Sequence, residues 1–375
     1  MRAYKTELKP TQKQIKLMNQ TFGNCRWVYN SYIAYNQKQY EKDKTFVSGY
    51  DYSKYINRSP DTPDWLKLTS SKATKQAIMY AERAFKGFFK KQSKYPRFKK
   101  KGKSKDSFYL IGSFHVERHR IKLPTLGWVR LKEYGYIPTN STPKSVTVSR
   151  VANRYYVSAL YDINVGTLVK PEGEPLGIDL GIKDLAICSN GKIYKNINKS
   201  TKVKKLEKQL KRQQRVLSRK YEYKKKRKGE ATNQNILKQK LKVQRLYNRL
   251  TNVRTDYQNK VINSIIKQKP SYITIEDLNV TGMLKNKHLS KAIQQQRLFG
   301  FKICLLQKSN ENNIEIRQVN RWYPSSKICS CCGFKKVDLS LSDRVYECSN
   351  CESVIDRDLN ASINLLQAKD YIVLT

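Results

Sequence analysis

Apolar residues in the first part of the chain recur at alternating steps of three and four, the spacing of one face of an α-helix. The residues that share this face are Ile15, Met18, Phe22, Cys25, Tyr29 and Tyr32. Thr11 and Gln14 have the spacing of a capping box, so we expect the helix to begin there, after a short strand over residues 1–9. A second helix is predicted from about Ser71 to Lys91.

The periodicity changes to short alternating runs between Ser107 and Ile163, such as SVTVSR and RYYVSALY on either side of Ala152 and Asn153. Alternating runs joined by turn residues predict an antiparallel sheet or a small barrel. The segment PEGEP at 171–175 combines glycine and proline, so we place a domain boundary there.

Two apolar strands beyond this boundary carry acidic residues. LGIDLG contains Asp179, and SYITIEDLNV ends in Glu276 and Asp277. Because neighbouring side chains of a strand point to opposite faces, only one of Glu276 and Asp277 can lie with Asp179, and we choose Glu276. A strand with a central aspartate that feeds a hairpin is typical of the opening of an RNase H-like sheet.

Further elements are predicted around these two strands. The Asn190-Gly191 pair is the strongest short hairpin signal in the chain. A helix over about 290–310 and a strand over 314–319 complete the expected sheet. Near the C-terminus, IDRDLNASINLLQA predicts a helix start with Ile363 and Leu366 on its inner face.

Residues 201–260 contain 21 Lys or Arg and 4 Asp or Glu, a local net charge of +17. An apolar stripe persists within them, which predicts two helical arms separated by the KKKRKGE stretch with Gly229. The stripe consists of Leu206, Leu210 and Leu217 in the first arm and Leu246, Leu250, Val253 and Tyr257 in the second. A charge run usually marks only a solvated face, but a local charge this high favours nearby counter-anions, and nucleic acid supplies them.

Composition extends this interpretation to the whole chain. The 375 residues have a net charge of +45 and are 39% hydrophobic, which predicts a globular protein of two or three domains with a polyanionic partner. No segment approaches the roughly 18 apolar residues of a membrane span, and the start lacks an apolar signal segment, so we expect a cytoplasmic protein of the bacterial or archaeal nucleoid. The run KYPRFKKKGKSK is either a solvated linker or a phosphate-tracking segment, and its interleaved aromatic residues favour the second.

Four cysteines form two knuckles, Cys329-x-x-Cys332 and Cys348-x-x-Cys351, separated by fifteen residues. This is the spacing of a four-thiolate ribbon that binds one structural Zn²⁺. Cys331 lies inside the first knuckle, and pairing it with Cys329 would make a loop too tight for the metal, so we treat it as a bystander. The ribbon staples a loop, and we expect it also to present a basic face to nucleic acid.

Acidic residues are scarce in this chain, 30 against 75 Lys or Arg, so the presence of carboxylates on apolar strands indicates a specific role for them. We predict that Asp179, Glu276 and Asp358 hold two Mg²⁺ ions roughly 3.5–4 Å apart, the arrangement used in phosphodiester hydrolysis. Asp356 has the position of a helix N-cap, so Asp358 is the better candidate ligand.

The motifs LGIDLGIKDLA, ITIEDLNV, SSKICSCCG with CSNC, and DRDLNASIN resemble, in order and spacing, the RuvC-like nuclease of the TnpB family. TFGNCRWVYN and YPRFKKK are similar to the amino-terminal domain of that family, so the resemblance covers nearly the whole chain. It places the family's acidic triad on Asp179, Glu276 and Asp358, and its zinc ligands on the four knuckle cysteines. Ser362 stands where the family usually has alanine.

The resemblance implies an α/β multidomain fold. A wedge-like β-barrel is expected over 1–10 and 104–165, with a helical recognition domain inserted over 11–103. A RuvC-like, RNase H-like nuclease domain is expected over 172–375, with the zinc ribbon inserted at 325–354. The implied activity is cleavage of double-stranded DNA beside a short transposon-adjacent motif, directed by a guide RNA made from the transposon end.

Two other classes of function remain open from the sequence. A guide-dependent DNA-binding repressor without nuclease activity should have lost at least one of the three acids, and all three are present. A strand-transferring transposase uses a similar acidic triad on a similar fold. The zinc ribbon and the basic helical hairpin favour the TnpB-like nuclease over the transposase, and RNA bound to the purified protein would separate the two.

Overall fold

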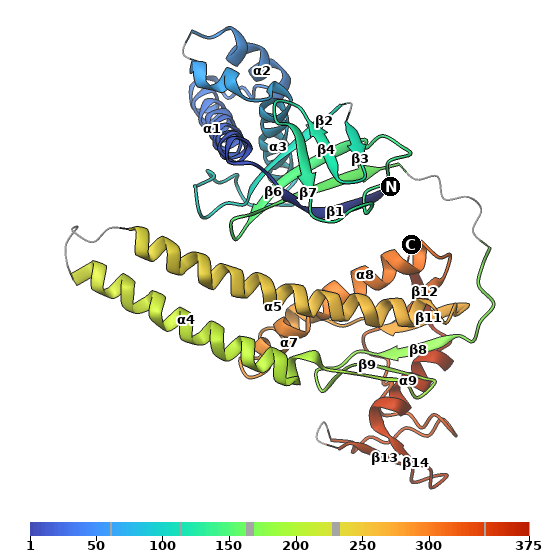
Figure 1. Cartoon of the computed structure of the whole chain (residues 1–375). Helices are drawn as coiled ribbons and strands as arrows, with labels where there is room; N and C mark the ends of the chain where they lie inside the picture. The colour runs from blue at the N-terminus through green and yellow to red at the C-terminus, as the bar shows by residue number, and fades with distance from the viewer. Residues whose placement is uncertain (61, 113, 163–168, 227–232, 341–342, 375) are drawn as a thin grey trace. The chain divides into compact units, whose positions relative to one another are not determined.

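The computed structural model describes residues 1–60, 62–112, 114–162, 169–226, 233–340 and 343–374. The chain divides into two compact units, Met1–Asn164 and Val165–Thr375, which we describe separately. Each unit combines helices with its own β-sheet, so the chain is a mixed α/β multidomain protein (Figure 1).

Unit 1 contains a seven-stranded antiparallel sheet in the order β2-β6-β7-β1-β5-β4-β3. Within the described residues β2 and β3 are edge strands with no pairing between them, so the sheet is open and the expected barrel is not observed. Helices α1 and α3 contact strand β2. The strands are β1 (Arg2–Lys9), β2 (Asp106–Ile111), β3 (His115–Glu117), β4 (Arg120–Leu123), β5 (Gly127–Leu131), β6 (Ser145–Val151) and β7 (Arg154–Tyr161).

Local sequence signals explain the hairpin and the helices of this unit. Ala152 and Asn153 join β6 to β7 with φ angles of 49° and 63°, the left-handed pair that a two-residue hairpin turn requires. The Thr11 and Gln14 side chains form the predicted capping box at the start of α1. The helices are α1 (Gln12–Asp43), α2 (Gly49–Arg58), the short 3₁₀ helix η1 (Asp64–Leu68) and α3 (Ser71–Phe89).

The predicted apolar stripe of α1 forms the core of unit 1. Met18, Phe22 and Cys25 are buried in a cluster with the sheet, against which Ile15 is partly buried, and Tyr29 and Tyr32 are buried in a second cluster with α2 and α3. Phe22 packs on Phe108 of β2 with ring centroids 5.3 Å apart. Beside this contact, Asp106 accepts hydrogen bonds from two arginines of other elements, so β2 is fixed by charge as well as by apolar packing.

Unit 2 contains a six-stranded sheet in the order β10-β9-β8-β11-β12-β15. The central strands β8, β11 and β12 are parallel, and β9, β10 and β15 run antiparallel to their neighbours. The predicted Asn190-Gly191 hairpin joins β9 to β10, with Gly191 at a φ of 80°. The strands are β8 (Leu176–Asp179), β9 (Asp184–Cys188), β10 (Ile193–Lys195), β11 (Tyr272–Glu276), β12 (Glu315–Val319) and β15 (Tyr371–Leu374).

Two long helices, α4 (Thr201–Lys226) and α5 (Gln234–Ile266), pack along each other and form the predicted hairpin. Leucines of the predicted stripe meet valines between the two arms. Gly229 of the predicted separator lies outside the described residues. The helix expected over 290–310 is divided, because Arg297 has a φ of 53° and ends the first part. The shorter elements are the 3₁₀ helix η2 (Ile197–Lys199), α6 (Val280–Met283), α7 (Ser290–Gln296) and α8 (Leu298–Asn310).

The last helix, α9 (Arg357–Gln367), packs on β8 and follows a small hairpin of β13 (Val345–Glu347) and β14 (Val354–Asp356). Leu366 lies against Gly177 of β8, as an inner-face residue should, but it is only partly buried, as is Ile363. A Cβ added to Gly177 of β8 would lie 2.0 Å from the carbonyl oxygen of Ser362, so the helix backbone approaches the strand very closely. Small and polar residues therefore occupy the inner face. These are Asn360, Ala361, Ser362, Asn364 and, in addition, Leu365. Of the helices described, none is long and apolar enough to cross a membrane.

Candidate active site and metal centre

Parallel pairing brings two of the predicted acidic residues to one edge of the unit 2 sheet. Ile178 of β8 pairs with Ile275 of β11, so Asp179 and Glu276 follow at the carboxyl ends of adjacent strands. Side chains at the carboxyl ends of parallel strands line the crevice in which open α/β sheets commonly bind ligands.

Helix α9 brings the third acidic residue to the same place. Asp356 caps the helix, because its Oδ1 accepts hydrogen bonds of 3.0 Å from the backbone N–H groups of Asp358 and Leu359. This is the N-cap role expected for Asp356. Asp358 therefore lies in the first turn of a helix that packs directly on β8.

The negative charges of Glu276 and Asp358 act on the carboxyl group of Asp179. Burial and then the negative charges of Glu276 and Asp358 together raise the pKa of Asp179 to about 8, while Arg357 opposes them. Burial also raises the pKa of Glu276, against a hydrogen bond from Ser325 that lowers it. A shared cation would relieve this repulsion, and carboxylate oxygens are the donors that Mg²⁺ prefers.

Asp277 turns away from this group, as strand alternation predicts. Its Oδ2 accepts a hydrogen bond of 2.6 Å from Nη2 of Arg321, and its Oδ1 lies 3.9 Å from Nζ of Lys302. Of the two neighbouring acids, Glu276 is the one whose charge acts on Asp179.

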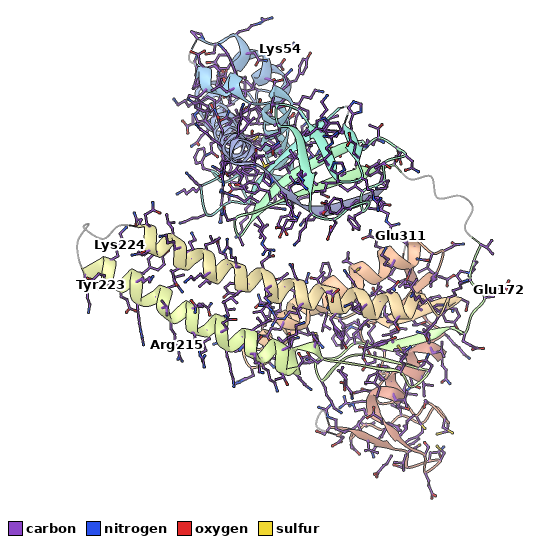
Figure 2. The ribbon with its side chains drawn as sticks, viewed as in Figure 1. Lys54, Glu172, Arg215, Tyr223, Lys224 and Glu311 are labelled. Carbon is purple, nitrogen blue, oxygen red and sulfur yellow. The ribbon has the colours of Figure 1, made fainter. Side chains whose placement is uncertain are left out.

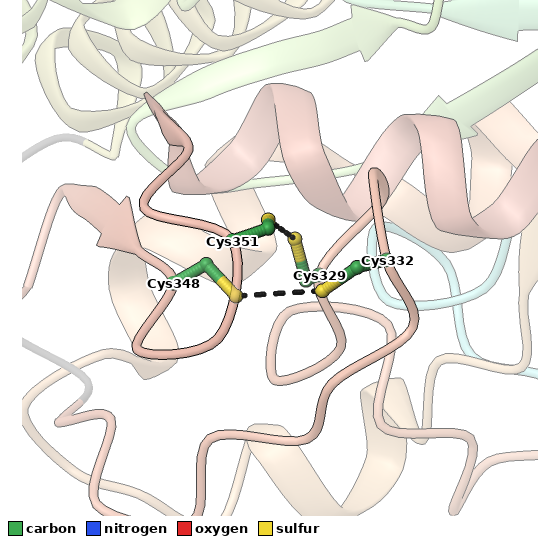
Figure 3. A group of neighbouring side chains, drawn as sticks. All are labelled: Cys329, Cys332, Cys348 and Cys351. Carbon is green, nitrogen blue, oxygen red and sulfur yellow. Dashed lines mark hydrogen bonds between the residues drawn. The ribbon is translucent and has the colours of Figure 1, made fainter.

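The four knuckle cysteines form a compact cluster (Figure 3). Their Sγ atoms all lie within 4.8 Å of one another, with 3.7 Å between Cys329 and Cys351 and 3.6 Å between Cys332 and Cys348. A tetrahedral ion with Zn–S bonds of about 2.3 Å requires S···S separations of about 3.8 Å. The cluster therefore fits a structural zinc ion, and Cys331 is exposed and outside it.

Local hydrogen bonds favour the thiolate form that zinc requires at Cys329 and Cys351, whereas burial raises the pKa of Cys348 to about 11. Ser353 lies 3.3 Å from Sγ of Cys351, and this hydrogen bond lowers the pKa of the Cys351 thiol to about 6. Ser353 also lies 3.3 Å from Sγ of Cys329, whose pKa is lowered as well. Neighbouring thiolates would repel one another in the absence of a cation, so these contacts are consistent with a bound divalent cation.

Two buried asparagines on α9 connect the cysteine cluster to the carboxylates, and the sequence reasoning missed them. Nδ2 of Asn364 donates to the carbonyl oxygens of Ser325 at 2.7 Å and Ile328 at 2.6 Å. Asn360 is fully buried, donates to the Ile328 oxygen at 2.7 Å and accepts from the backbone N–H of Ser330 at 2.9 Å. The available signal was two asparagines at i and i+4 inside an otherwise apolar helix face.

The segment held by these asparagines reaches the carboxylates directly. Ser325 is buried, and its hydroxyl donates to Oε1 of Glu276. Four residues later, Cys329 enters the thiolate cluster. One short segment therefore carries both a contact to the carboxylate site and a ligand candidate for zinc.

The α4/α5 hairpin presents a large basic surface within the same unit. Lys211, Arg215 and Arg219 are exposed along α4 and border a shallow depression. Figure 2 labels Arg215, Tyr223 and Lys224 along this helix. Successive basic side chains on one helix provide the spacing needed to contact a phosphodiester backbone.

Comparison with protein families gives matches along most of the chain. The OrfB_IS605 model, described as "Probable transposase", matches residues 158–287. A model described as "Cas12f1-like, TNB domain" matches residues 300–365, which include all four clustered cysteines. A "Helix-turn-helix domain" model matches residues 1–45, where the structure has β1 and the single helix α1.

Two curated relatives align over almost the whole chain. "Putative RNA-guided DNA endonuclease InsQ" of Escherichia coli (strain K12) is 30% identical, with 98% of this chain and 92% of that protein covered. A "Putative RNA-guided DNA endonuclease" of Streptomyces pristinaespiralis is 32% identical, with 98% and 89% covered. Among solved structures, a Cas12f1-sgRNA-target DNA complex matches with a TM-score of 0.37 and 15% identity over 98% of this chain and all of that chain.

Proposed function

This chain belongs to the OrfB family of transposon-encoded proteins, also called TnpB, and from that membership we propose that it is an RNA-guided DNA endonuclease. The observation that carries the proposal is the convergence of Asp179, Glu276 and Asp358 at one sheet edge of a chain with a net charge of +45. Two negative charges that raise the pKa of a buried aspartate in a strongly basic protein are best explained by a bound cation and a polyanionic substrate.

The three carboxylates are proposed to hold two Mg²⁺ ions, for which their oxygen donors are suited. When bound, such ions activate a water molecule and offset charge on the attacking and leaving oxygens of a phosphodiester. The protein's own contribution is orientation. Ser325 holds one oxygen of Glu276, and the Asp356 cap fixes the helix turn that carries Asp358.

The proposed partners are a guide RNA made from the transposon end and double-stranded target DNA beside a short adjacent motif. Residues 1–10 and 104–165 serve as the wedge and 11–103 as the recognition domain. Residues 172–375 form the RNase H-like nuclease domain, with the zinc ribbon at 325–354. The guide–target duplex is recognised by its A-form shape. The basic hairpin, with a net charge of +17 over 201–260, supports such a partner.

A strand-transferring transposase is the second candidate, favoured by the description "Probable transposase" of the matching family model. The two activities give different products from the same DNA. A guided endonuclease leaves free ends at sites that follow the RNA sequence, whereas a transposase joins donor ends to a new strand. Incubating the purified protein–RNA complex with labelled target and donor DNA tests the proposal, and joined products without any requirement for RNA would contradict it.

Ser325→Ala should reduce the rate of guided cleavage roughly tenfold and raise the Mg²⁺ concentration needed for half-maximal cleavage. The mutation removes the buried hydroxyl that donates to Glu276, so the carboxylate loses its orientation. A lost hydrogen bond of this kind costs about 1 kcal/mol of stability, which leaves the protein folded. Cleavage rates measured across a Mg²⁺ titration check the result.

Ser362→Ala is the matched control for this prediction. Ser362 is also buried, but its hydroxyl donates to the Leu359 carbonyl oxygen at 2.7 Å on the same helix. It should lose similar stability without a change in Mg²⁺ dependence. Equal changes in Mg²⁺ dependence for both variants would show that Ser325 acts only through stability.

Replacing Lys211, Arg215 and Arg219 together with glutamine should weaken nucleic-acid binding and reduce its dependence on salt. Each phosphate contact contributes a slope of about −0.7 to −0.9 in a plot of log K against log salt, so the slope should become shallower by about 2 to 3. Titrations at several salt concentrations measure this slope. Ser218→Ala, a neutral change beside the same residues, should leave it unaltered. An unchanged slope in the triple variant would mean that this face of α4 does not contact phosphates.

A further inference from the structure

A cavity of about 650 Å³ opens at the edge of the unit 2 sheet where β11 and β12 end and β15 begins. Asp277, Arg321, Trp322, Lys369 and Tyr371 contribute to its lining. None of these residues is assigned a role in the proposed chemistry. The volume lies within the range of about 300–1,000 Å³ that is typical of sites for small organic groups.

The cavity lies beside the carboxylates because of the strand order. β12 is the neighbour of β11 on the side away from β8, and Val319 at its end pairs with Glu276. The chain continues from Val319 into Arg321 and Trp322. Asp179, Glu276 and the cavity therefore follow one another along the carboxyl ends of three parallel strands.

Trp322 is unusually accessible for a tryptophan, with 85% of its side chain exposed. Its backbone is held in place, since its N–H donates to Oδ1 of Asn320 at 2.9 Å. A large apolar ring held at the rim of a cavity has a flat face available for stacking. Stacking of bases on such rings is a general way to bind unpaired nucleic acid without regard to sequence.

Arg321 supplies a cation beside this ring. Asp277 accepts a hydrogen bond of 2.6 Å from Nη2 of Arg321, and 45% of the arginine side chain remains exposed. Asp277 thus orients the guanidinium without enclosing it. Guanidinium groups present several fixed donors, which suits them to phosphate oxygens. The lining also contains the exposed Lys369 and Asp370, whose opposite charges offset each other.

We propose that this cavity binds one nucleotide of the unpaired DNA strand that enters the carboxylate site. The base stacks on Trp322, and a phosphate pairs with Arg321, which Asp277 orients. The proposal rests on the proposed function and adds to it the way in which the strand is held next to the reacting phosphate. Unpaired DNA and the guide RNA both offer bases and phosphates to such a cavity, so the test has to distinguish binding of DNA from binding of RNA.

Intrinsic fluorescence gives a direct test, because Trp322 is the single tryptophan of unit 2 and the other three lie in unit 1. The protein–RNA complex is prepared with Asp358→Ala to prevent cleavage, with and without the additional change Trp322→Phe. The difference between the two emission spectra is the signal of Trp322. Adding target DNA should quench it, whereas RNase treatment of the DNA-free complex should leave it unaltered.

Cleavage kinetics of the otherwise unmodified protein give the second readout. Trp322→Ala should raise the KM for DNA roughly tenfold to a hundredfold and change kcat by less than about threefold, because it removes binding by stacking. Trp322→Phe, which keeps a smaller ring, should recover most of the loss. Phe299→Ala is the control, since this ring is 62% exposed in the same unit and lies outside the cavity lining.

The outcomes separate this inference from the proposed function. No change of the Trp322 signal on adding DNA would overturn the inference, as would an unchanged KM in Trp322→Ala while the wild-type protein still cuts under guidance. A Trp322 signal that changes on RNase treatment would show that RNA occupies the cavity and would also overturn it. Absence of guided cutting by the wild-type protein would count against the proposed function itself.

Discussion

Asp179→Asn is expected to abolish guided DNA cleavage and, at the same time, to make the magnesium-free protein more stable. Cleavage should fall at least a thousandfold, about 4 kcal/mol, because one carboxylate of the proposed Mg²⁺ site is lost. Binding of target DNA should remain, since the residue lies at the sheet edge and not on the basic hairpin. Cleavage and DNA-binding assays on the same preparation measure both effects.

The stability change follows from the raised pKa of Asp179. Its pKa of about 8 in the folded protein lies above the usual 3.8, so the folded state holds a proton that the unfolded chain releases. The free energy of unfolding therefore falls as pH rises from about 4 to 8. Asparagine removes this penalty, which is on the order of 2–5 kcal/mol above pH 8. Thermal unfolding in magnesium-free buffer without a chelator should show a higher Tm for the variant at pH 8.5 and a smaller difference at pH 5.

Asp356→Asn and Asp358→Asn form the matched pair for the same site. Asparagine caps helices as well as aspartate does, so Asp356→Asn should keep near-normal cleavage. Asp358→Asn should be inactive. Near-normal cleavage by Asp358→Asn together with loss in Asp356→Asn would show that Asp356, and not Asp358, is the metal ligand.

Cys348→Ser is expected to release the structural zinc and to unfold the ribbon. The apparent free energy of zinc binding in isolated fingers is about 10–16 kcal/mol, so loss of one thiolate should leave the metal weakly held. Cleavage should be lost as well, because Ser325 and Cys329 belong to one segment that Asn364 and Asn360 hold to α9. Metal analysis of the purified chain, together with cleavage assays, checks the prediction.

Cys331→Ser is the control for the cysteine cluster. Cys331 is exposed and lies outside the group of four, so this variant should retain one zinc per chain and normal cleavage. Loss of zinc in Cys331→Ser with retention in Cys332→Ser would mean that the first knuckle uses a different cysteine. Full cleavage by zinc-free Cys348→Ser would show that the ribbon does not support the carboxylate site.

Secondary structure could be predicted well wherever a local signal acts alone. The capping box at Thr11 and the turns at Ala152-Asn153 and Asn190-Gly191 depend on a few adjacent residues, and all three are present. The apolar stripes of α1 and of the α4/α5 hairpin could be predicted because their residues recur at helical spacing and lie in hydrophobic clusters.

Tertiary contacts explain the errors. Within the described residues the sheet of unit 1 is open, with β2 and β3 at its two edges, and strand periodicity does not encode whether a sheet closes. The break at Arg297 has no glycine or proline signal. The carbonyl oxygen of Gln296, just before the break, accepts a hydrogen bond of 2.7 Å from the side chain of Gln258. The side chain of Gln296 donates to the carbonyl oxygen of Gly181, so residues distant in the sequence hold the turn.

The residues of the candidate site also fall into two groups, those that local sequence patterns identify and those that depend on tertiary contacts. Asp179, Glu276 and the four cysteines could be singled out because acids at strand ends and paired cysteine knuckles are local patterns. Ser325, Asn360 and Asn364 could not, since their role depends on how α9 packs against the segment before the ribbon. Close packing of α9 against Gly177 is accompanied by burial of Asn360, Ser362 and Asn364, which the periodicity of apolar residues does not predict.

The central claim is that RNA directs this protein to the DNA that it cuts. The most direct measurement is to express the chain with the flanking DNA of its own locus, purify it at high salt, exchange the guide segment of the bound RNA and map the cuts. The account predicts that the cuts move to DNA that matches the new guide, next to the same short motif. Recovery of only random cellular RNA, with cuts that do not depend on the guide, would contradict it and indicate a nonspecific metal-dependent nuclease.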